Sequence, residues 1–333
     1  MSEKKVMKLP SKVTVGECVV REGAQHEEHF IPTEAKLWLL RNMLKAGFKR
    51  LEVTSLSSPK YVPQFTDAEE VLRGLQPLQE GVVYTVVTVV QAAIDRAIKA
   101  CDAGNRFTEV VNMWSTSESH SKRNTGMDHA KLFETTRKWI KSVHEVGLEF
   151  CGCVGTVFGC PIEGPVPIEK SFDFADRLLD MGADSIMFGD TTGEATPERV
   201  YEFYCEVKEK FPNIPIVAHF HESRGWGLSN CLAALQAGIE IYDASMGGIG
   251  GQPAAIVDRV PCLGTGKIYT PSDITGNVRS EDFIVMLDEM GISTGLDVDA
   301  VLEIGRTVEK IFGRRLRSYT IETGRIPKVH TGR

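Results

Sequence analysis

The 333-residue sequence lacks the features that would point to a membrane, a secreted fold or a disulfide framework. It has no stretch of about 18 consecutive apolar residues, so no transmembrane helix is expected. Its charged start, MSEKKVMK, has none of the apolar core of a secretory signal, which favours a cytoplasmic location. The eight cysteines include no C-x-x-C pair, so we expect free, mostly buried thiols.

An excess of positive charge is also missing. The formal net charge is −7 and the isoelectric point is near 5.7, which gives no general attraction to phosphate backbones or anionic lipids. Basic residues concentrate only near the ends, in MSEKKVMK, GRRLRSY and GRIPKVHTGR, which we interpret as solvated tails rather than a binding patch. Neither nucleic acid nor a membrane is expected as a partner.

What is present is an alternation of short β-branched runs with helix-length amphipathic segments, the pattern of βα units around a parallel sheet. No G-x-G-x-x-G follows the first run, and eight runs exceed the usual number in an open doubly wound sheet. The pattern therefore predicts a closed (β/α)8 TIM barrel with a C-terminal helical extension. The runs begin at Val13, Lys49, Val82, Thr108, Leu148, Ser185, Pro215 and Ile239.

The same pattern predicts the domain organisation. Residues 1–12 would be an N-terminal tail, residues 13–295 the barrel as the catalytic domain, and residues 296–333 a C-terminal helix and basic tail. Within the barrel, TEAKLWLLRNMLKAG has apolar residues at helical spacing and ends in Gly47, which suits a helix C-terminus. After Ala244 the pattern loosens into the glycine-rich loop MGGIGGQPAA, and the helical segments SEDFIVMLDEMG and VDAVLEIGRTVEKIFG follow.

Polar side chains gather where the predicted strands end, which is where active sites of such barrels lie. His219 and His221 are two residues apart on the seventh strand, so both face the same side. Glu22, where the first strand is expected to end, could add a carboxylate, and two histidines with one carboxylate form a common divalent-metal site. The alternatives are a pair of core or surface histidines, and a surface ion pair between Glu22 and Arg21.

Other polar positions carry weaker signals. Glu52 could line the site or be a satisfied interior acid. Asp190 could line the site or cap the following helix. The glycine loop could hold a phosphate, act as a lid or simply connect two elements. Arg21, if buried beside a metal, would suit the stabilisation of an enolate oxygen.

The segments VREGAQ, SPKYVPQ, FGCPIEG, FGDTTGEATP, VAHFHESRGWGLSN and GGIGG occur in this order and resemble the 3-hydroxy-3-methylglutaryl-CoA lyase family. This family belongs to the metal-dependent barrels that include isopropylmalate and homocitrate synthases. The resemblance runs from about Val13 to Gly295. It implies Mg²⁺ or Mn²⁺ as the cofactor and a homodimer as the assembly. It implies metal ligation by Glu22, His219, His221 and Asn277, catalytic roles for Arg21, Glu52, Asp190 and His219, and substrate contacts from Gln25 and Gln252.

The resemblance implies a function in the same way. We expect a divalent-metal-dependent carbon–carbon lyase that cleaves a thioester like 3-hydroxy-3-methylglutaryl-CoA to acetyl-CoA and a keto acid. The substrate would be an acyl-CoA or an organic acid. One alternative is a Claisen-type acyl transferase that condenses acetyl-CoA with a 2-oxo acid, and another is a non-catalytic barrel that keeps its metal as a structural or sensory element.

The sequence departs from the lyase pattern at several positions. Glu22 stands where the lyases have aspartate, although homocitrate synthases have R-E-G. Gln252 replaces the cysteine of the lyase glycine loop, and an amide cannot act as a general acid or base. The chain is longer than the lyase pattern between Pro253 and Gly276, where Cys262 could supply the missing thiol or be an ordinary buried cysteine. Glu28 stands where the lyases tend to have lysine.

Overall fold

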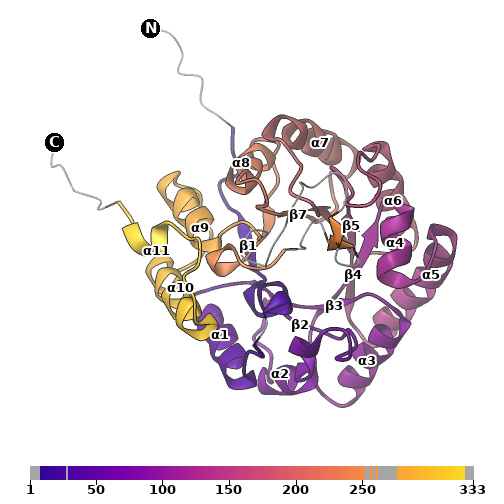
Figure 1. The fold of residues 1–333 in the computed structure, drawn as a ribbon, viewed down its shortest axis with the longest axis horizontal. Coiled ribbons are helices and arrows are strands. Elements are labelled where there is room, and N and C mark those ends of the chain that lie inside the picture. The colour runs from indigo at the N-terminus through magenta and orange to yellow at the C-terminus, as the bar shows by residue number, and fades with distance from the viewer. Residues whose placement is uncertain (1–7, 28, 252–255, 258–259, 262–275, 327–333) are drawn as a thin grey trace, which may run out of the picture.

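The computed structural model describes residues 8–27, 29–251, 256–257, 260–261 and 276–326. In this part of the chain, eight parallel strands close into a barrel in chain order (Figure 1). Each of the eight predicted runs overlaps one of them, so the predicted barrel is confirmed. The strands are β1 (Thr14–Glu17), β2 (Arg50–Ser55), β3 (Val83–Thr88), β4 (Glu109–Ser115), β5 (Glu149–Gly155), β6 (Ser185–Asp190), β7 (Ile216–Phe220) and β8 (Ile241–Ala244).

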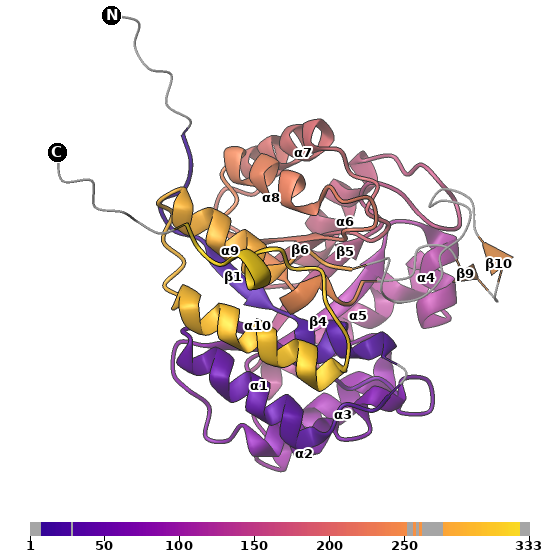
Figure 2. The ribbon, with the colours of Figure 1, turned by 60° about the vertical axis from the view of Figure 1, so that its left-hand side comes forward.

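Helices form a layer around this barrel (Figure 1). Those that connect the strands are α1 (Thr33–Lys45), α2 (Ala68–Gly74), α3 (Gln91–Asp102), α4 (Glu118–Thr125), α5 (His129–Glu145), α6 (Glu169–Asp180), α7 (Pro197–Lys210) and α8 (Gly227–Gln236). The predicted C-terminal helices are present as α9 (Ser280–Glu289) and α10 (Val298–Phe312), followed by the short α11 (Thr320–Thr323). Helix α10 packs on α1 and α9 (Figure 2), and its Val301 and Val308 join the same core as the barrel. A separate antiparallel pair consists of β9 (Ile256–Val257) and β10 (Val260–Pro261).

Helix α1 shows how the local sequence sets an element. Its buried Leu39, Leu40 and Met43 repeat at helical spacing and face the core. The helix ends at Lys45, and Gly47 follows with φ of 100°, a conformation that favours glycine. A Cβ atom on Gly47 would lie 2.7 Å from the carbonyl oxygen of Gly295. The predicted role of Gly47 at the helix C-terminus is confirmed.

The described core has two parts. One fills the space between strands and helices, and the other lies inside the barrel and consists of Val87, Val111, Cys151, Cys153, Met187 and Val217. Strands buried on both faces explain why the sequence runs are β-branched and nearly continuous in apolar residues. Of the described cysteines, all are free and all but Cys205 are buried, as expected.

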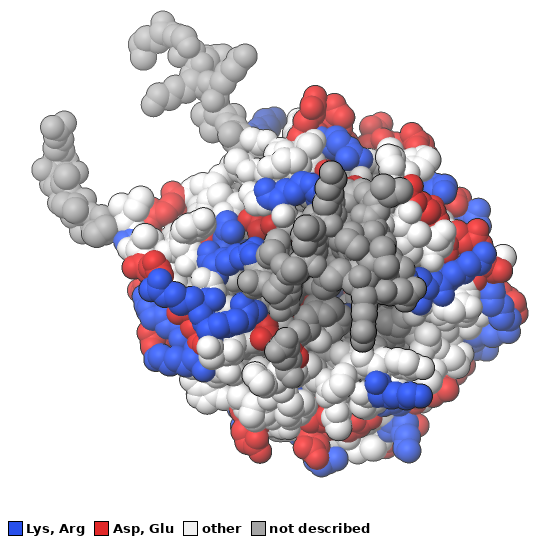
Figure 3. Space-filling model, in the orientation of Figure 1, with Lys and Arg blue, Asp and Glu red and all other residues white. Residues whose placement is uncertain are grey.

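The outer surface agrees with the mixed charge of the sequence. Figure 3 shows acidic and basic side chains interspersed around the face that it presents. Among the described residues, no helix combines the length and the apolar character needed to cross a membrane.

Candidate metal centre and active site

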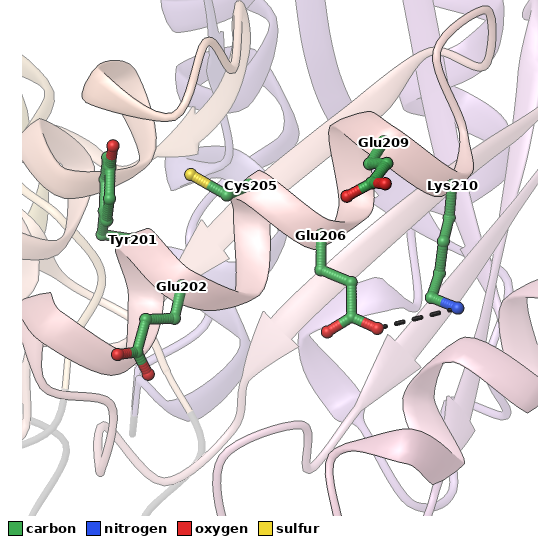
Figure 4. A pocket seen from close by; sticks show the side chains of 6 residues that line it. All are labelled: Tyr201, Glu202, Cys205, Glu206, Glu209 and Lys210. Carbon is green, nitrogen blue, oxygen red and sulfur yellow. Dashed lines mark ion pairs between the residues drawn. The ribbon is translucent and has the colours of Figure 1, made fainter.

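A surface depression on α7 is not the place where the predicted site residues meet. It has a volume of about 560 Å³ and is lined by Tyr201, Glu202, Cys205, Glu206, Glu209 and Lys210 (Figure 4). These residues come from one exposed helix face, and Glu206 pairs with Lys210 at 3.6 Å. The predicted residues lie instead at the carboxyl ends of the strands.

The first strand ends earlier than the sequence suggested. The expectation that it runs to Arg21, Glu22 and Gly23 is wrong, because β1 stops at Glu17 and residues Val19–Gly23 form a π-helical turn. The carbonyl oxygen of Cys18 accepts hydrogen bonds from the N–H groups of residues 21, 22 and 23, at 2.8–3.2 Å. This curl directs both Arg21 and Glu22 inward, whereas successive residues of a strand would point to opposite faces.

The side chains of Glu22, His219 and His221 converge at the barrel mouth. Nε2 of His221 lies 3.1 Å from Nε2 of His219 and 3.1 Å from Oε1 of Glu22. Nε2 of His219 lies 3.5 Å from Oε2 of Glu22. All three residues are 9% exposed or less, so neither a surface ion pair nor a pair of surface histidines describes them. One candidate ligand atom from each residue lies within 4.8 Å of the others.

The outer contacts of the two imidazoles determine which atoms they present to this point. Nδ1 of His221 lies 2.7 Å from the carbonyl oxygen of Thr191, which can only accept, so Nδ1 carries the proton. Nδ1 of His219 lies 3.4 Å from a carboxylate oxygen of Asp243. In the neutral rings both Nε2 atoms therefore present lone pairs toward the Glu22 carboxylate. Acceptors that converge in this way can hold a cation.

The close contacts within this cluster also shift the pKa values of Glu22 and His219. Burial alone would raise the pKa of Glu22, but the neighbouring histidines hold it well below its ordinary value. Burial alone would lower the pKa of His219, but the charges of Glu22 and Asp243 raise it well above the ordinary value. The cluster thus favours positive charge between its members, whether a proton or a metal ion supplies it.

Asn277 lies next to this cluster. It forms an isolated β-bridge with His221 and is buried. Neither atom of its side-chain amide has a hydrogen-bond partner among the described residues, which is costly for a buried amide. Its oxygen is available as a further metal ligand.

Arg21 links the cluster to Glu52. Its Nη1 lies 3.0 Å from Oε1 of Glu52 and 3.7 Å from Oε2 of Glu22, and its Nη2 lies 3.7 Å from Sδ of Met113. Arg21 and Glu52 are both buried. Burial raises the pKa of Glu52 to about 7 despite the opposing charge of Arg21. A carboxyl group with this pKa can accept or release a proton near neutral pH.

Asp190 lies beneath the mouth and is fully buried. Its two oxygens accept hydrogen bonds from the backbone N–H groups of Glu194 and Ala195, at 3.0 and 3.1 Å. The side chain that caps α7 is Thr196, so the alternative that Asp190 caps this helix is wrong. Asp190 instead orders the turn that carries Thr191, whose carbonyl group contacts His221.

Of the remaining predicted residues, the structure describes only Gln25. Gln25 lies in the short 3-10 turn Ala24–His26 that follows the π-helical turn. Gln252, Cys262 and Glu28 lie outside the described residues.

Some residues at or beside the site were not predicted from the sequence, namely Asp243, Arg50, Glu109, Glu17 and Met113. Each is charged or sulfur-containing within an apolar strand run, which is the signal that could have indicated them. Asp243 contacts His219, and Met113 contacts Arg21. Periodicity alone does not show that such residues meet inside the barrel, because they lie on different strands.

The fold and these contacts together define a class of protein: a (β/α)8 barrel with a candidate divalent-cation centre at the carboxyl ends of its strands. The HMGL-like family model matches residues 12–308. The chain therefore belongs to the HMGL-like family.

Individual relatives agree with this assignment. The chain is 30% identical to a hydroxymethylglutaryl-CoA lyase of Bacillus subtilis over 95% of this chain and 98% of the relative. It is 32% identical to a cytoplasmic 3-hydroxy-3-methylglutaryl-CoA lyase of Mus musculus over 93% of this chain and 84% of that enzyme. A solved structure of an HMG-CoA lyase from Acinetobacter baumannii, in complex with coenzyme A and 3-methylmalate, superposes with a TM-score of 0.83. It shares 30% identity and covers 96% of this chain and 97% of its own.

Proposed function

We propose that this protein is a divalent-metal-dependent carbon–carbon lyase that cleaves 3-hydroxy-3-methylglutaryl-CoA, or a closely similar thioester, to acetyl-CoA and a keto acid. The observation that carries the proposal is the convergence of Glu22, His219 and His221 at the barrel mouth, 9% exposed or less. The lyase relatives, which match over more than nine-tenths of this chain, support the reaction type. The coenzyme A in the Acinetobacter baumannii complex supports an acyl-CoA substrate.

The charges of the described network fit a divalent cation. Arg21 pairs with Glu22 and Glu52, and Arg50 pairs with Glu109 and Asp243. Asp243 and Glu22 are joined through His219. With neutral histidines and ionised acids, four carboxylates face two guanidinium groups, which leaves two negative charges. One divalent cation would neutralise them.

The donor set favours Mg²⁺ or Mn²⁺. Glu22, His219, His221 and the amide oxygen of Asn277 would hold the ion, leaving positions for water and substrate. When bound, the ion supplies a Lewis acid that polarises oxygens of the substrate.

The other buried groups have roles in the bond cleavage. Glu52 accepts the proton of the tertiary hydroxyl, and the carbon–carbon bond breaks as that oxygen becomes the keto oxygen of the product. The electron pair of the bond passes to the thioester fragment, where the Arg21 guanidinium stabilises the enolate oxygen. The Nε atom of Arg21 has no hydrogen-bond partner among the described residues, so it is available to donate. The proton accepted by Glu52 then passes to the enolate carbon, which completes acetyl-CoA and restores the Glu52 carboxylate.

The test is a direct assay. Purified protein with Mg²⁺ or Mn²⁺ and 3-hydroxy-3-methylglutaryl-CoA should yield equal amounts of acetyl-CoA and acetoacetate, and EDTA should stop the reaction. His219→Ala should lower kcat/KM by more than the roughly 100-fold loss typical of changes to outer contacts of a metal. His144→Ala is the matched control, since His144 pairs with Asp184 at 2.9 Å on the partly exposed surface.

Two results would argue against the lyase proposal. Absence of acetyl-CoA across a panel of 3-hydroxy-3-alkylglutaryl thioesters would refute the lyase. Release of free coenzyme A from acetyl-CoA in the presence of a 2-oxo acid would instead support the Claisen-type alternative.

Two further properties stay predictions. A cytoplasmic location is supported by the relative that carries this location in its name. A homodimer is testable by light scattering of the purified protein.

A further inference from the structure

A buried ion network lies inside the barrel, next to the candidate metal centre. Nε of Arg50, on β2, lies 3.5 Å from Oδ1 of Asp243 on β8, and Nη2 of Arg50 lies 2.7 Å from Oε1 of Glu109 on β4. On its far side, Oε2 of Glu109 accepts a hydrogen bond from the hydroxyl of Ser185, on β6, at 3.3 Å. All four residues are buried. The network therefore crosses the barrel interior between even-numbered strands.

Asp243 connects this network to the metal centre because its two oxygens face different groups. Oδ1 faces Arg50, and Oδ2 lies 3.4 Å from Nδ1 of His219. Since a carboxylate only accepts hydrogen bonds, Nδ1 of His219 must carry the proton for this contact. Nε2 is then the atom left with a lone pair for the metal.

The barrel leaves room for this arrangement at Gly16 of β1. A Cβ atom on Gly16 would lie 2.7 Å from Oδ1 of Asp243 and 3.1 Å from Cδ of Arg50. Real side chains do not tolerate the shorter of these distances. The absence of a side chain at Gly16 therefore permits Arg50 and Asp243 to meet.

We propose that Arg50 is a positioning residue for the metal centre, acting through Asp243 on His219. The rigid guanidinium is held between two carboxylates, with Glu109 beside Nη2 at 2.7 Å and Asp243 beside Nε at 3.5 Å. Asp243 is thereby held in the orientation that receives Nδ1–H of His219. The inference rests on the proposed metal centre.

Energetics explain why an arginine is needed at this position. A buried carboxylate without a partner is costly, and Asp243 would otherwise have only His219 to neutralise it. Arg50 supplies a second partner on the other side of the carboxylate, where it pairs with Oδ1 and leaves Oδ2 to accept Nδ1–H of His219.

The experiment measures Mn²⁺ binding to the metal-free protein by calorimetry, with circular dichroism to verify folding. Asp243→Asn should weaken Mn²⁺ binding about 10- to 100-fold, the usual range for partners of metal-bound histidines. Arg50→Lys should weaken it about 10-fold, because an ammonium group cannot reach Glu109 and Asp243 together in the same geometry. Glu109→Gln is the matched control: it removes one carboxylate charge beside the same arginine but keeps an oxygen that can accept from the guanidinium, and it has no contact with His219, so it should change affinity by less than about 3-fold.

A double variant tests whether Arg50 acts through Asp243. In the Asp243→Asn background, Arg50→Lys should cause no further loss of Mn²⁺ affinity, because the link is already broken. The visible spectrum of the Co²⁺-loaded protein should change in Asp243→Asn and Arg50→Lys but not in Glu109→Gln. This spectrum reports ligand geometry independently of stability.

Three results would overturn the inference. Parent-like Mn²⁺ affinity in Asp243→Asn would remove the link to His219, and equal losses from Arg50→Lys in both backgrounds would show that Arg50 acts elsewhere. Equal losses from Glu109→Gln and Asp243→Asn would reduce the effect to net charge. If the parent protein binds neither Mn²⁺ nor Mg²⁺, the proposed metal centre itself fails, which is distinguishable from the other three results.

Discussion

Single side chains at the barrel mouth acquire their chemistry from the groups they face. Arg21 and Glu22 are adjacent in sequence, where they suggest a surface ion pair. In the structure both are buried, and each faces a different partner: Arg21 pairs with Glu52, and Glu22 faces the two histidines. Under the proposed function, Arg21 would stabilise an anion and Glu22 would bind the metal.

Met113 is the residue for which we expect an effect on substrate choice. It lies on β4 on the same face as the interior residue Val111, is 40% exposed, and has its sulfur 3.7 Å from Nη2 of Arg21. Under the proposed function, the alkyl group on the tertiary carbon would pack against this thioether. We expect Met113→Ala to lower kcat/KM for 3-hydroxy-3-methylglutaryl-CoA about 10-fold, and to lower it less, or raise it, for a 3-ethyl analogue.

The ratio of the two kcat/KM values is the decisive measurement. Met113→Leu is the control, because it nearly preserves volume and should leave the ratio close to that of the parent. A ratio that is equal in Met113→Ala and parent, while absolute rates fall, would assign Met113 to packing alone.

At the scale of elements, one carboxyl group joins three segments that lie at the barrel mouth or lead directly from it. Oε1 of Glu17 accepts hydrogen bonds from the N–H groups of Val19 and Met246, each at 2.9 Å, and Oε2 accepts one from the Ser280 hydroxyl at 2.5 Å. These donors begin the turn of Arg21 and Glu22, the glycine-rich loop, and helix α9. Glu17 therefore holds the parts of the mouth in register.

We expect Glu17→Ala to destabilise the protein by more than about 3 kcal/mol, because it leaves three buried donors without acceptors, each worth roughly 1–3 kcal/mol. Urea denaturation monitored by circular dichroism measures the free energy of unfolding. Glu17→Gln keeps an acceptor oxygen and should cost less. If Glu17→Ala unfolds at the same urea concentration as the parent, the three segments are held by other contacts.

At the scale of the whole molecule, buried acids make stability depend on pH. Burial raises the pKa of Glu17 to about 7 and that of Glu281, which accepts hydrogen bonds from Gly247 N–H, to about 8. Both pKa values lie above the ordinary value of 4.5. Between pH 4.5 and these raised values, the folded protein therefore binds more protons than the unfolded chain. Their contribution to stability is complete below pH 4.5 and is lost as the pH rises through about 7 and about 8.

We therefore expect the metal-free protein to be less stable at about pH 8.5 than at about pH 5.5. The free energy of unfolding should fall by a few kcal/mol, because each unit of pKa shift contributes about 1.4 kcal/mol. Urea midpoints across this range test it. Glu281→Gln, which is neutral at every pH, should show a flatter dependence than the parent. Parallel curves for the two proteins would mean that Glu281 does not carry the effect.

Much of this architecture follows from local sequence. The eight strand runs were identifiable because a parallel strand buried on both faces needs β-branched and apolar residues throughout. Gly47 marked the end of α1, since a backbone with φ of 100° favours glycine. His219 and His221 indicated one face because side chains in a strand alternate. The roles assigned to Arg21, Glu52, Asp190, Gln25, Gln252 and the metal ligands stay predictions for the experiments above.

The tertiary structure decided where these groups meet. The π-helical turn that points Arg21 and Glu22 inward begins at Val19, whose N–H donates a hydrogen bond to Glu17, and Glu17 is 263 residues from its other partner, Ser280. The contact of His219 with Asp243, and of Asp243 with Arg50, joins strands that come together only when the barrel closes. Propensity and periodicity are properties of neighbouring residues, and they determined the elements. The pairing of buried charges depends on distance in space, and only the closed barrel sets that distance.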